Sequence, residues 1–363
     1  MNGNEINDKR SKKEFKGVTF SKFKKSDVKK ELLNSLNNGR IEPACYWSAE
    51  FICAGHFLEL WDNIILFATK HIHLGNPKLP LYLQLRFNNF KDIIVGGYME
   101  NEIKMRNNKK IRSLFGEIIS ILALSNKKHT LSKVKIDKDD FQLQNITDKL
   151  KADNINYANR IYLKDDPKEL FIALNEFAYN LTSRRNKTVD ACYWLEWIME
   201  FENVCKREKK IKLMAAPRHI APVDNKIKTD IIWMIWEIFL LEAENRGGIT
   251  KKIVSALLEI FSIKYTSGTK RKRRFLMYNV ISLLTEPVDY NIYIFTEEKK
   301  IDTIKKKIDI IYKQIKNNEV RPDTDYLFNN SFNNSFTGDE RNLENTIKKL
   351  DQMNNMMYIP RDK

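Results

Sequence analysis

The sequence has few of the features that would indicate a secreted or membrane protein. Only 4 of its 363 residues are cysteines, and no two of them form a CxxC pair. No apolar run reaches the roughly 20 residues that a membrane-spanning helix needs, and the longest, from Ile231 to Leu241, is interrupted by Glu237. Residues 1–30 are polar and rich in lysine, unlike a secretory signal. We therefore expect reduced, buried thiols, a cytosolic or nuclear setting and no membrane span.

The sequence also lacks the signatures of common catalytic sites. It contains neither a GxxxxGK[ST] loop nor a GxGxxG turn. Cys45 and Cys192, the candidate nucleophiles, each lie in an apolar helical pattern, where a free cysteine behaves as a small hydrophobic residue. If the protein is an enzyme, its catalytic residues must come from parts of the chain that are distant in sequence and meet only in the folded structure. We expect no enzyme activity and no cofactor.

One stretch could supply zinc ligands. Cys53 and His56 would share one helix face, and His71 and His73 would follow at the end of that helix. The second half of the chain lacks this pattern, and histidines near the carboxyl end of a helix stabilise its dipole. The sequence therefore favours a structural role for these histidines and no metal site.

Charge is the most unbalanced property of the composition. Lysine and arginine number 63 against 47 acidic residues, which gives a net charge of +16. Such an excess favours anionic partners and opposes self-association. AT-rich coding bias, which raises lysine, asparagine and isoleucine together, is the alternative explanation for part of the lysine content.

The sequence contains an internal repeat. The word Ala-Cys-Tyr-Trp occurs at residues 44–47 and again at residues 191–194, and each copy opens an apolar stripe of helical spacing. Residues 115–125 match residues 257–267, with Glu117 aligned to Glu259. A middle element, 79–90 or 230–243, lies between the matches in each copy. We expect six of the aromatic residues in these stripes to be buried: Trp47, Phe51, Trp194, Trp197, Trp233 and Trp236.

These matches predict a mainly α fold of two pseudo-symmetric helical repeats, for which a tandem cyclin-box arrangement is one analogy. Strand-like runs are few, and the best are residues 79–85 and 291–295. The predicted organisation is a flexible basic arm at 1–28, repeat 1 at 29–132, a linker at 133–166, repeat 2 at 167–316, and a polar tail with a short terminal helix at 317–363.

Clusters of basic residues carry the functional prediction. Five consecutive cations precede an apolar helical pattern: Lys270, Arg271, Lys272, Arg273 and Arg274. Positive charge at a helix start opposes the helix dipole, so bound phosphate would explain this run. Weaker clusters in turns add further candidate contacts to DNA or RNA: Lys127, Lys128, Arg184, Arg185 and Lys187. The alternatives are a solvated turn or, for the five-residue run, a nuclear import signal.

Residues 42–86 resemble a family of uncharacterised proteins shared among nucleocytoplasmic large DNA viruses. The resemblance is carried by residues 44–50, Gly55-His56, Leu60-Trp61 and residues 73–78. It implies a giant-virus protein of the replication, transcription or assembly programme, located in the host cytoplasm (the viral factory), the nucleus or the virion. It implies no catalytic residues.

Two functions follow as hypotheses. The first is a non-enzymatic helical factor that contacts nucleic acid through its basic clusters in replication, transcription or genome packaging. The second is a virion structural or scaffold protein whose aromatic helices bind other viral proteins.

Overall fold

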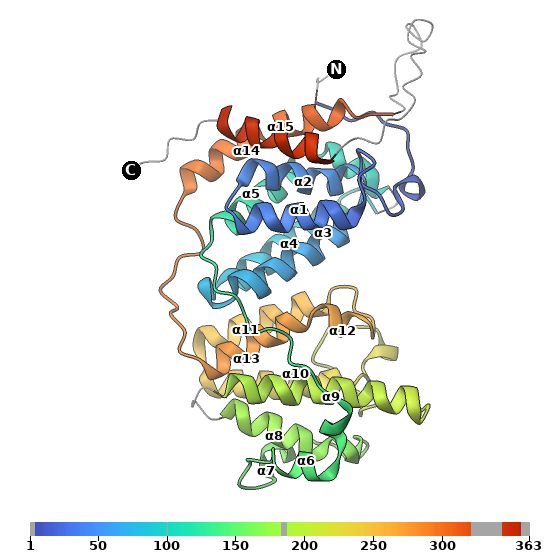
Figure 1. The fold of residues 1–363 in the computed structure, drawn as a ribbon, viewed down its shortest axis with the longest axis vertical. Coiled ribbons are helices and arrows are strands. Elements are labelled where there is room, and N and C mark those ends of the chain that lie inside the picture. The colour runs from blue at the N-terminus through green and yellow to red at the C-terminus, as the bar shows by residue number, and fades with distance from the viewer. Residues whose placement is uncertain (1–3, 100, 183–186, 321–342, 357–363) are drawn as a thin grey trace, which may run out of the picture. The chain divides into compact units, whose positions relative to one another are not determined.

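The computed structural model describes residues 4–99, 101–182, 187–320 and 343–356, and these ranges are mainly α-helical (Figure 1). No strand is found in the described ranges, and an isolated antiparallel bridge pairs Val18 with Lys24. The predicted mainly α class is confirmed. Both strand candidates are wrong, because residues 79–85 lie in helix α4 (Leu79–Val95) and residues 291–295 form turns and bends. None of the described helices is long and apolar enough to cross a membrane.

The chain forms two compact units that differ from the predicted repeats. Unit 1 comprises Met1–Phe67, Leu85–Asn126 and Tyr293–Lys363, and unit 2 comprises Ala68–Gln84 and Lys127–Ile292. Residues 293–316, which we assigned to repeat 2, therefore belong to unit 1. The physical reason is helix α14 (Glu298–Lys316), whose isoleucines recur every three or four residues and pack on helices of unit 1.

Unit 1 is arranged around one helix that is buried on all sides, α2 (Ile41–Cys53). Four helices of this unit pack directly against α2. They are α1 (Lys25–Asn37), α5 (Lys109–Leu124), α14 and α15 (Leu343–Met356). Helix α3 (Phe57–Phe67) follows α2 and contacts it as well. The short terminal helix expected in the tail is confirmed as α15, whereas residues 321–342 of that tail lie outside the described residues.

The predicted flexible arm is wrong for its described part, because residues 4–24 pack onto unit 1. Phe15 and Phe20 are fully buried, and the guanidinium of Arg10 lies 4.7 and 4.8 Å from their ring centroids. The Ser21 amide and hydroxyl donate to the buried Glu50 carboxylate at 2.9 and 2.5 Å. The aromatic residues between the lysines supply enough buried surface to hold this segment in place.

Helix α4 contributes to both units, because the division falls between Gln84 and Leu85. The other α-helices belong to unit 2. They are α6 (Leu143–Thr147), α7 (Asn156–Asn159), α8 (Phe171–Thr182), α9 (Thr188–Glu208), α10 (Ile232–Arg246), α11 (Gly248–Ser262), α12 (Thr269–Lys272) and α13 (Arg274–Thr285). Helices α9 and α13 run antiparallel, because the start of α9 contacts the end of α13 and Glu202 near the end of α9 contacts Lys270 before α13.

The predicted linker at 133–166 belongs to unit 2 and is anchored to it at a few points, although many of its residues are exposed. Ala158 and Ile161 are buried, and the Asp166 carboxylate accepts a hydrogen bond of 2.6 Å from Arg218 Nη2. The indole Nε1 of Trp197 donates to the Asp140 carbonyl oxygen at 3.0 Å. The segment is polar overall, so its composition alone does not reveal the few residues that attach it: the buried Ala158 and Ile161 and the paired Asp166.

All six aromatic residues predicted to be buried are at most 5% exposed, so that prediction is confirmed. The two Ala-Cys-Tyr-Trp words lie in α2 and α9, and the other matched segments lie in α5 and α11. Their surroundings differ: Glu117 is buried and bound by Arg86 and Lys305, whereas Glu259 is exposed. Duplication and the cyclin-box analogy stay predictions.

Candidate nucleic-acid interface

The five-cation run is not one basic helix start, because α12 and α13 divide it. Lys270 is 3% exposed, and its ammonium lies 2.5 Å from Glu202 and 2.9 Å from Asp230. Two carboxylates therefore neutralise this lysine inside unit 2. The prediction that Lys270 is an exposed phosphate contact is therefore wrong.

Two more cations of the run have internal partners. Nη1 of Arg273 donates to the carbonyl oxygens of Phe261 and Ile263 at 2.8 and 2.6 Å, and so caps the carboxyl end of α11. Nη1 of Arg274 lies 3.0 and 2.9 Å from the two carboxylate oxygens of Glu196 on α9. Contacts within the protein therefore explain the positive charge of Lys270, Arg273 and Arg274 at this helix start, and bound phosphate is not needed to explain it.

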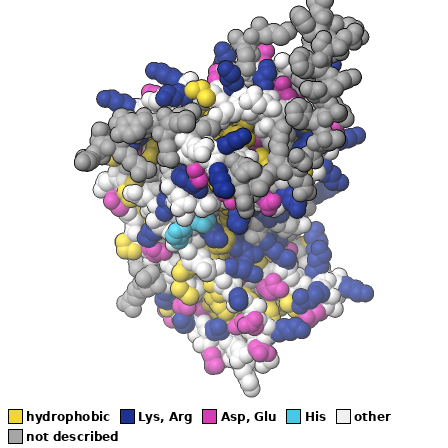
Figure 2. Space-filling model, turned by 45° about the horizontal axis from the view of Figure 1, so that its top comes forward, with side chains coloured by type: hydrophobic (Ala, Val, Ile, Leu, Met, Phe, Trp, Pro, Cys, Tyr) yellow, Lys and Arg dark blue, Asp and Glu magenta, His cyan; other side chains and the backbone are white. Residues whose placement is uncertain are grey.

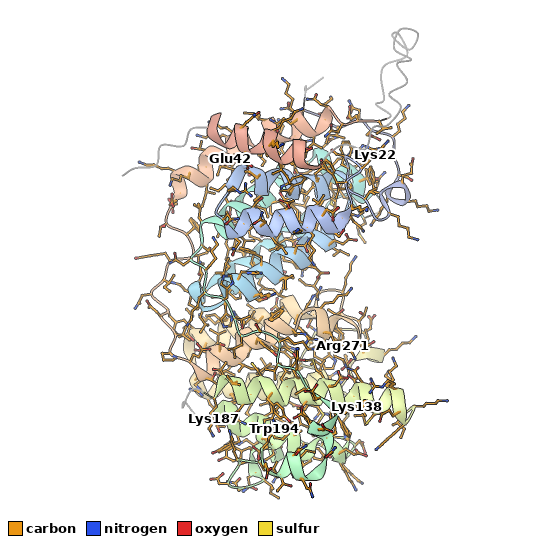
Figure 3. All side chains as sticks on the ribbon, in the orientation of Figure 1. Lys22, Glu42, Lys138, Lys187, Trp194 and Arg271 are labelled. Atoms are coloured by element: carbon orange, nitrogen blue, oxygen red, sulfur yellow. The ribbon has the colours of Figure 1, made fainter. Side chains whose placement is uncertain are left out.

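Arg271 and Lys272 remain exposed and available to a partner. Figure 3 shows Arg271 on one side of unit 2 and Lys187 on the other. The separation follows from the antiparallel helices, because α9 rises about 21 Å over the 14 residues between Thr188 and Glu202. Lys187 and Arg271 therefore do not form one site.

The other predicted contacts have mixed outcomes. The ammonium of Lys187 lies 3.6 Å from the ring centroid of Tyr179, while Lys128 is half exposed and 3.5 Å from Glu286. Partial burial lowers the pKa of Lys127 to about 8. Arg184 and Arg185 lie outside the described residues.

A segment that we had assigned to the linker provides the exposed lysines that sequence reasoning missed. Lys133, Lys135 and Lys138 are exposed, whereas Val134 and Ile136 between them are half-buried. The Val134 amide donates to the hydroxyl of Tyr278 on α13 at 3.1 Å, which fixes the segment against that helix. The alternation Lys-Val-Lys-Ile is the period-two signal that could have identified an extended segment with lysines on one face.

An aromatic ring lies among these cations. The ammonium of Lys70 is 5.1 Å from the ring centroid of Phe275, which is half-buried at the start of α13. Figure 2 shows a dense group of Lys and Arg side chains close to histidine side chains. We call six residues the basic surface of unit 2: Lys70, Lys128, Lys133, Lys135, Arg271 and Lys272.

Glu196 on α9 links the lysine segment to α13. It accepts from Arg274 and from Tyr278, and the charge of Lys133 acts on its carboxylate. Burial raises the pKa of Glu196, and the cations Arg274 and Lys133 oppose that rise. The Glu196 carboxylate is thus already paired with Arg274, which is not part of the basic surface.

The structure gives no support to a nucleophilic cysteine. Cys45 and Cys192 are fully buried. Burial raises the pKa of Cys45 to about 12 and that of Cys192 well above its usual value. Both thiols therefore stay protonated near neutral pH, and a protonated buried thiol is a poor nucleophile.

The candidate zinc ligands have other partners. The Nε2 of His56 donates to the carbonyl oxygens of Phe15 and Val18 at 3.0 and 2.9 Å, and the ring of His73 contacts the Asn279 amide at 3.0 Å. Over the described ranges, no group of three or more His, Cys, Asp or Glu side chains is placed to hold a metal ion.

No protein-family model, curated protein or solved structure gives a significant match to this chain. The viral resemblance of residues 42–86 therefore stays a prediction. Any proposal about function depends on the geometry of the chain itself.

Proposed function

We propose that unit 2 binds nucleic acid through its basic surface. The observation that carries this proposal is the lysine segment on α13: Lys133 and Lys135 face solvent, while Val134 and Ile136 between them anchor the chain. Residues two apart in an extended chain point to the same face, so the two ammonium groups can contact successive charges of a polyanion. Arg271 and Lys272 extend the cationic area at the α12–α13 corner.

The expected contacts are to phosphate rather than to bases. Lysine is a flexible point charge, and the surface includes only one arginine, Arg271, among its six cations. Contacts of this kind position a protein on nucleic acid without reading its sequence. The proposed role is therefore sequence-tolerant binding in replication, transcription or genome packaging.

A salt titration tests the proposal. Binding of a labelled oligonucleotide is followed by fluorescence anisotropy for the wild type and for the triple variant Lys133→Ala, Lys135→Ala, Arg271→Ala. Each phosphate neutralised on duplex DNA contributes about 0.9 to the log–log slope against salt. We expect the triple variant to lose roughly two to three from that slope.

The matched control carries the same change in net charge on exposed lysines of unit 1. Lys29→Ala, Lys30→Ala and Lys306→Ala should leave the slope unchanged, because these residues lie on α1 and α14. Equal losses in both triple variants would show that only total charge matters. An unchanged slope in the unit 2 variant would refute the proposed surface.

The scaffold hypothesis has one supporting observation. Leu85, Val95 and Met99 in unit 1 are 56%, 70% and 72% exposed. Exposed large apolar side chains are characteristic of protein-binding surfaces when they are contiguous. If the wild type binds no oligonucleotide near physiological salt, the protein-binding alternative becomes the preferred function.

A further inference from the structure

Two histidines contact each other beside the basic surface of unit 2. The amides of Lys128 and Thr130 donate to the carbonyl oxygens of Ile72 and Lys70 at 3.3 and 3.0 Å. These bonds hold residues 128–130 and 70–72 side by side in opposite directions, with residue 129 opposite His71. The Nδ1 atoms of His71 and His129 are then 3.1 Å apart, with ring planes at 85°.

At that distance the two rings share one proton. A hydrogen bond between two imidazole nitrogens needs one donor and one acceptor, so the pair is satisfied when one Nδ1 is protonated and the other is not. Placing a proton on both Nδ1 atoms would bring two donors together and break that bond. One further proton is accepted without this loss at the Nε2 atom of the donating ring, and the positive charge that results favours a bound anion.

The charged neighbours of the pair are mostly cationic. Lys70 precedes His71 and acts on it electrostatically, and Lys128 precedes His129 with its ammonium 3.5 Å from Glu286. The buried His73 lies nearby and responds to Glu286 and Lys128. Burial, the charge of Lys70 and the charge of His129 lower the pKa of His71 to about 4.

We propose that His71 and His129, with Lys70 and Lys128, form a phosphate-binding subsite whose affinity increases as the pH falls. This inference rests on the proposed function, because the phosphate belongs to the bound nucleic acid. A phosphate supplies the negative charge that the pair lacks, so its binding draws one proton from solvent onto the Nε2 atom of the ring whose Nδ1 donates. The singly protonated pair keeps its Nδ1–H···Nδ1 hydrogen bond and offers two Nε2–H donors, one of them on a charged ring, beside two ammonium groups.

Proton uptake on binding must appear as pH-dependent affinity. One proton taken up increases the association constant up to about tenfold for each pH unit lost. We therefore compare oligonucleotide binding between pH 7.5 and pH 5.5 at fixed salt for the wild type and for the double variant His71→Gln, His129→Gln. Glutamine retains a polar side chain and removes the titration. We expect the affinity of the wild type to rise steeply over this range and that of the variant to rise much less.

The same comparison of wild type and double variant separates the titration of the two histidines from the titration of other groups near the surface. Glu196 also lies near the basic surface, and its protonation would release Arg274 in both proteins. Histidine NMR of the wild type gives a second measurement: adding the oligonucleotide at pH 6 should shift the ring nitrogen resonances of His71 and His129 toward the protonated form, leaving those of the exposed His219 largely unchanged.

The outcomes separate this inference from the proposed function. Absence of binding at every pH would refute the proposed function itself. Salt-sensitive binding with the same pH dependence in the wild type and the double variant would refute only the histidine subsite. Unshifted His71 and His129 resonances in the saturated complex would refute it as well.

Discussion

Replacing Lys270 by alanine should strongly destabilise unit 2, although this lysine lies in a run of basic residues. Its side chain is 4% exposed and holds Glu202 at 2.5 Å and Asp230 at 2.9 Å. The Glu202 and Asp230 side chains are 14% and 8% exposed, so Lys270→Ala leaves two buried carboxylates without their cation. Breaking a buried ion pair by removing one partner costs about 3–5 kcal/mol.

Urea denaturation measures this cost, and Lys272→Ala is the matched control. Lys272 belongs to the same run and is exposed, so its removal should change the unfolding free energy by less than about 0.5 kcal/mol. The double variant Lys270→Met, Asp230→Asn should lose less than the sum of its single variants, because the second change removes one unpaired charge. A cost below about 1 kcal/mol for Lys270→Ala would refute the buried network.

Three further changes test the packing. Trp194→Ala should cost about 3–5 kcal/mol in urea, because the indole is 2% exposed. Ser21→Ala should cost about 1–3 kcal/mol, because it removes the hydroxyl donor to the buried Glu50 and leaves the amide of residue 21 as a donor. Burial lowers the pKa of His73 to about 4, so the unfolded state binds a proton at a higher pH than the folded state does. The free energy of unfolding should therefore fall by about 3 kcal/mol as the pH decreases from about 6.5 to 4. The loss should be smaller in His73→Asn, which tolerates the left-handed backbone at φ 48°.

Local periodicity explains what the sequence predicted correctly. The apolar spacing after each Ala-Cys-Tyr-Trp word requires only the helical repeat, so α2, α9 and the burial of Trp47 and Trp194 could be anticipated. The packing of residues 4–24 could not be anticipated, because Phe15 and Phe20 lie in a lysine-rich stretch and follow no helical or strand period. Their rings stack on each other, with centroids 6.0 Å apart, and against Arg10.

The candidate site was harder to predict because charge partners are distant in sequence. Asp230 is 40 positions from Lys270, and Glu196 is 78 positions from Arg274. A run of cations therefore does not show which members are already neutralised inside the fold. Conversely, the polar composition of residues 133–166 predicts a linker, whereas the alternation of Lys133 and Lys135 with Val134 and Ile136 indicates a segment with one exposed face.

Lysine footprinting tests the location of the proposed nucleic-acid interface most directly. The protein is acylated briefly with and without a saturating oligonucleotide, and modification of each lysine is measured by mass spectrometry. We predict that the oligonucleotide protects Lys133 and Lys135, while Lys29 and Lys30 on α1 react as before, and that high salt abolishes the protection. Unchanged reactivity of Lys133 and Lys135 in a protein that binds the oligonucleotide would contradict the proposed interface.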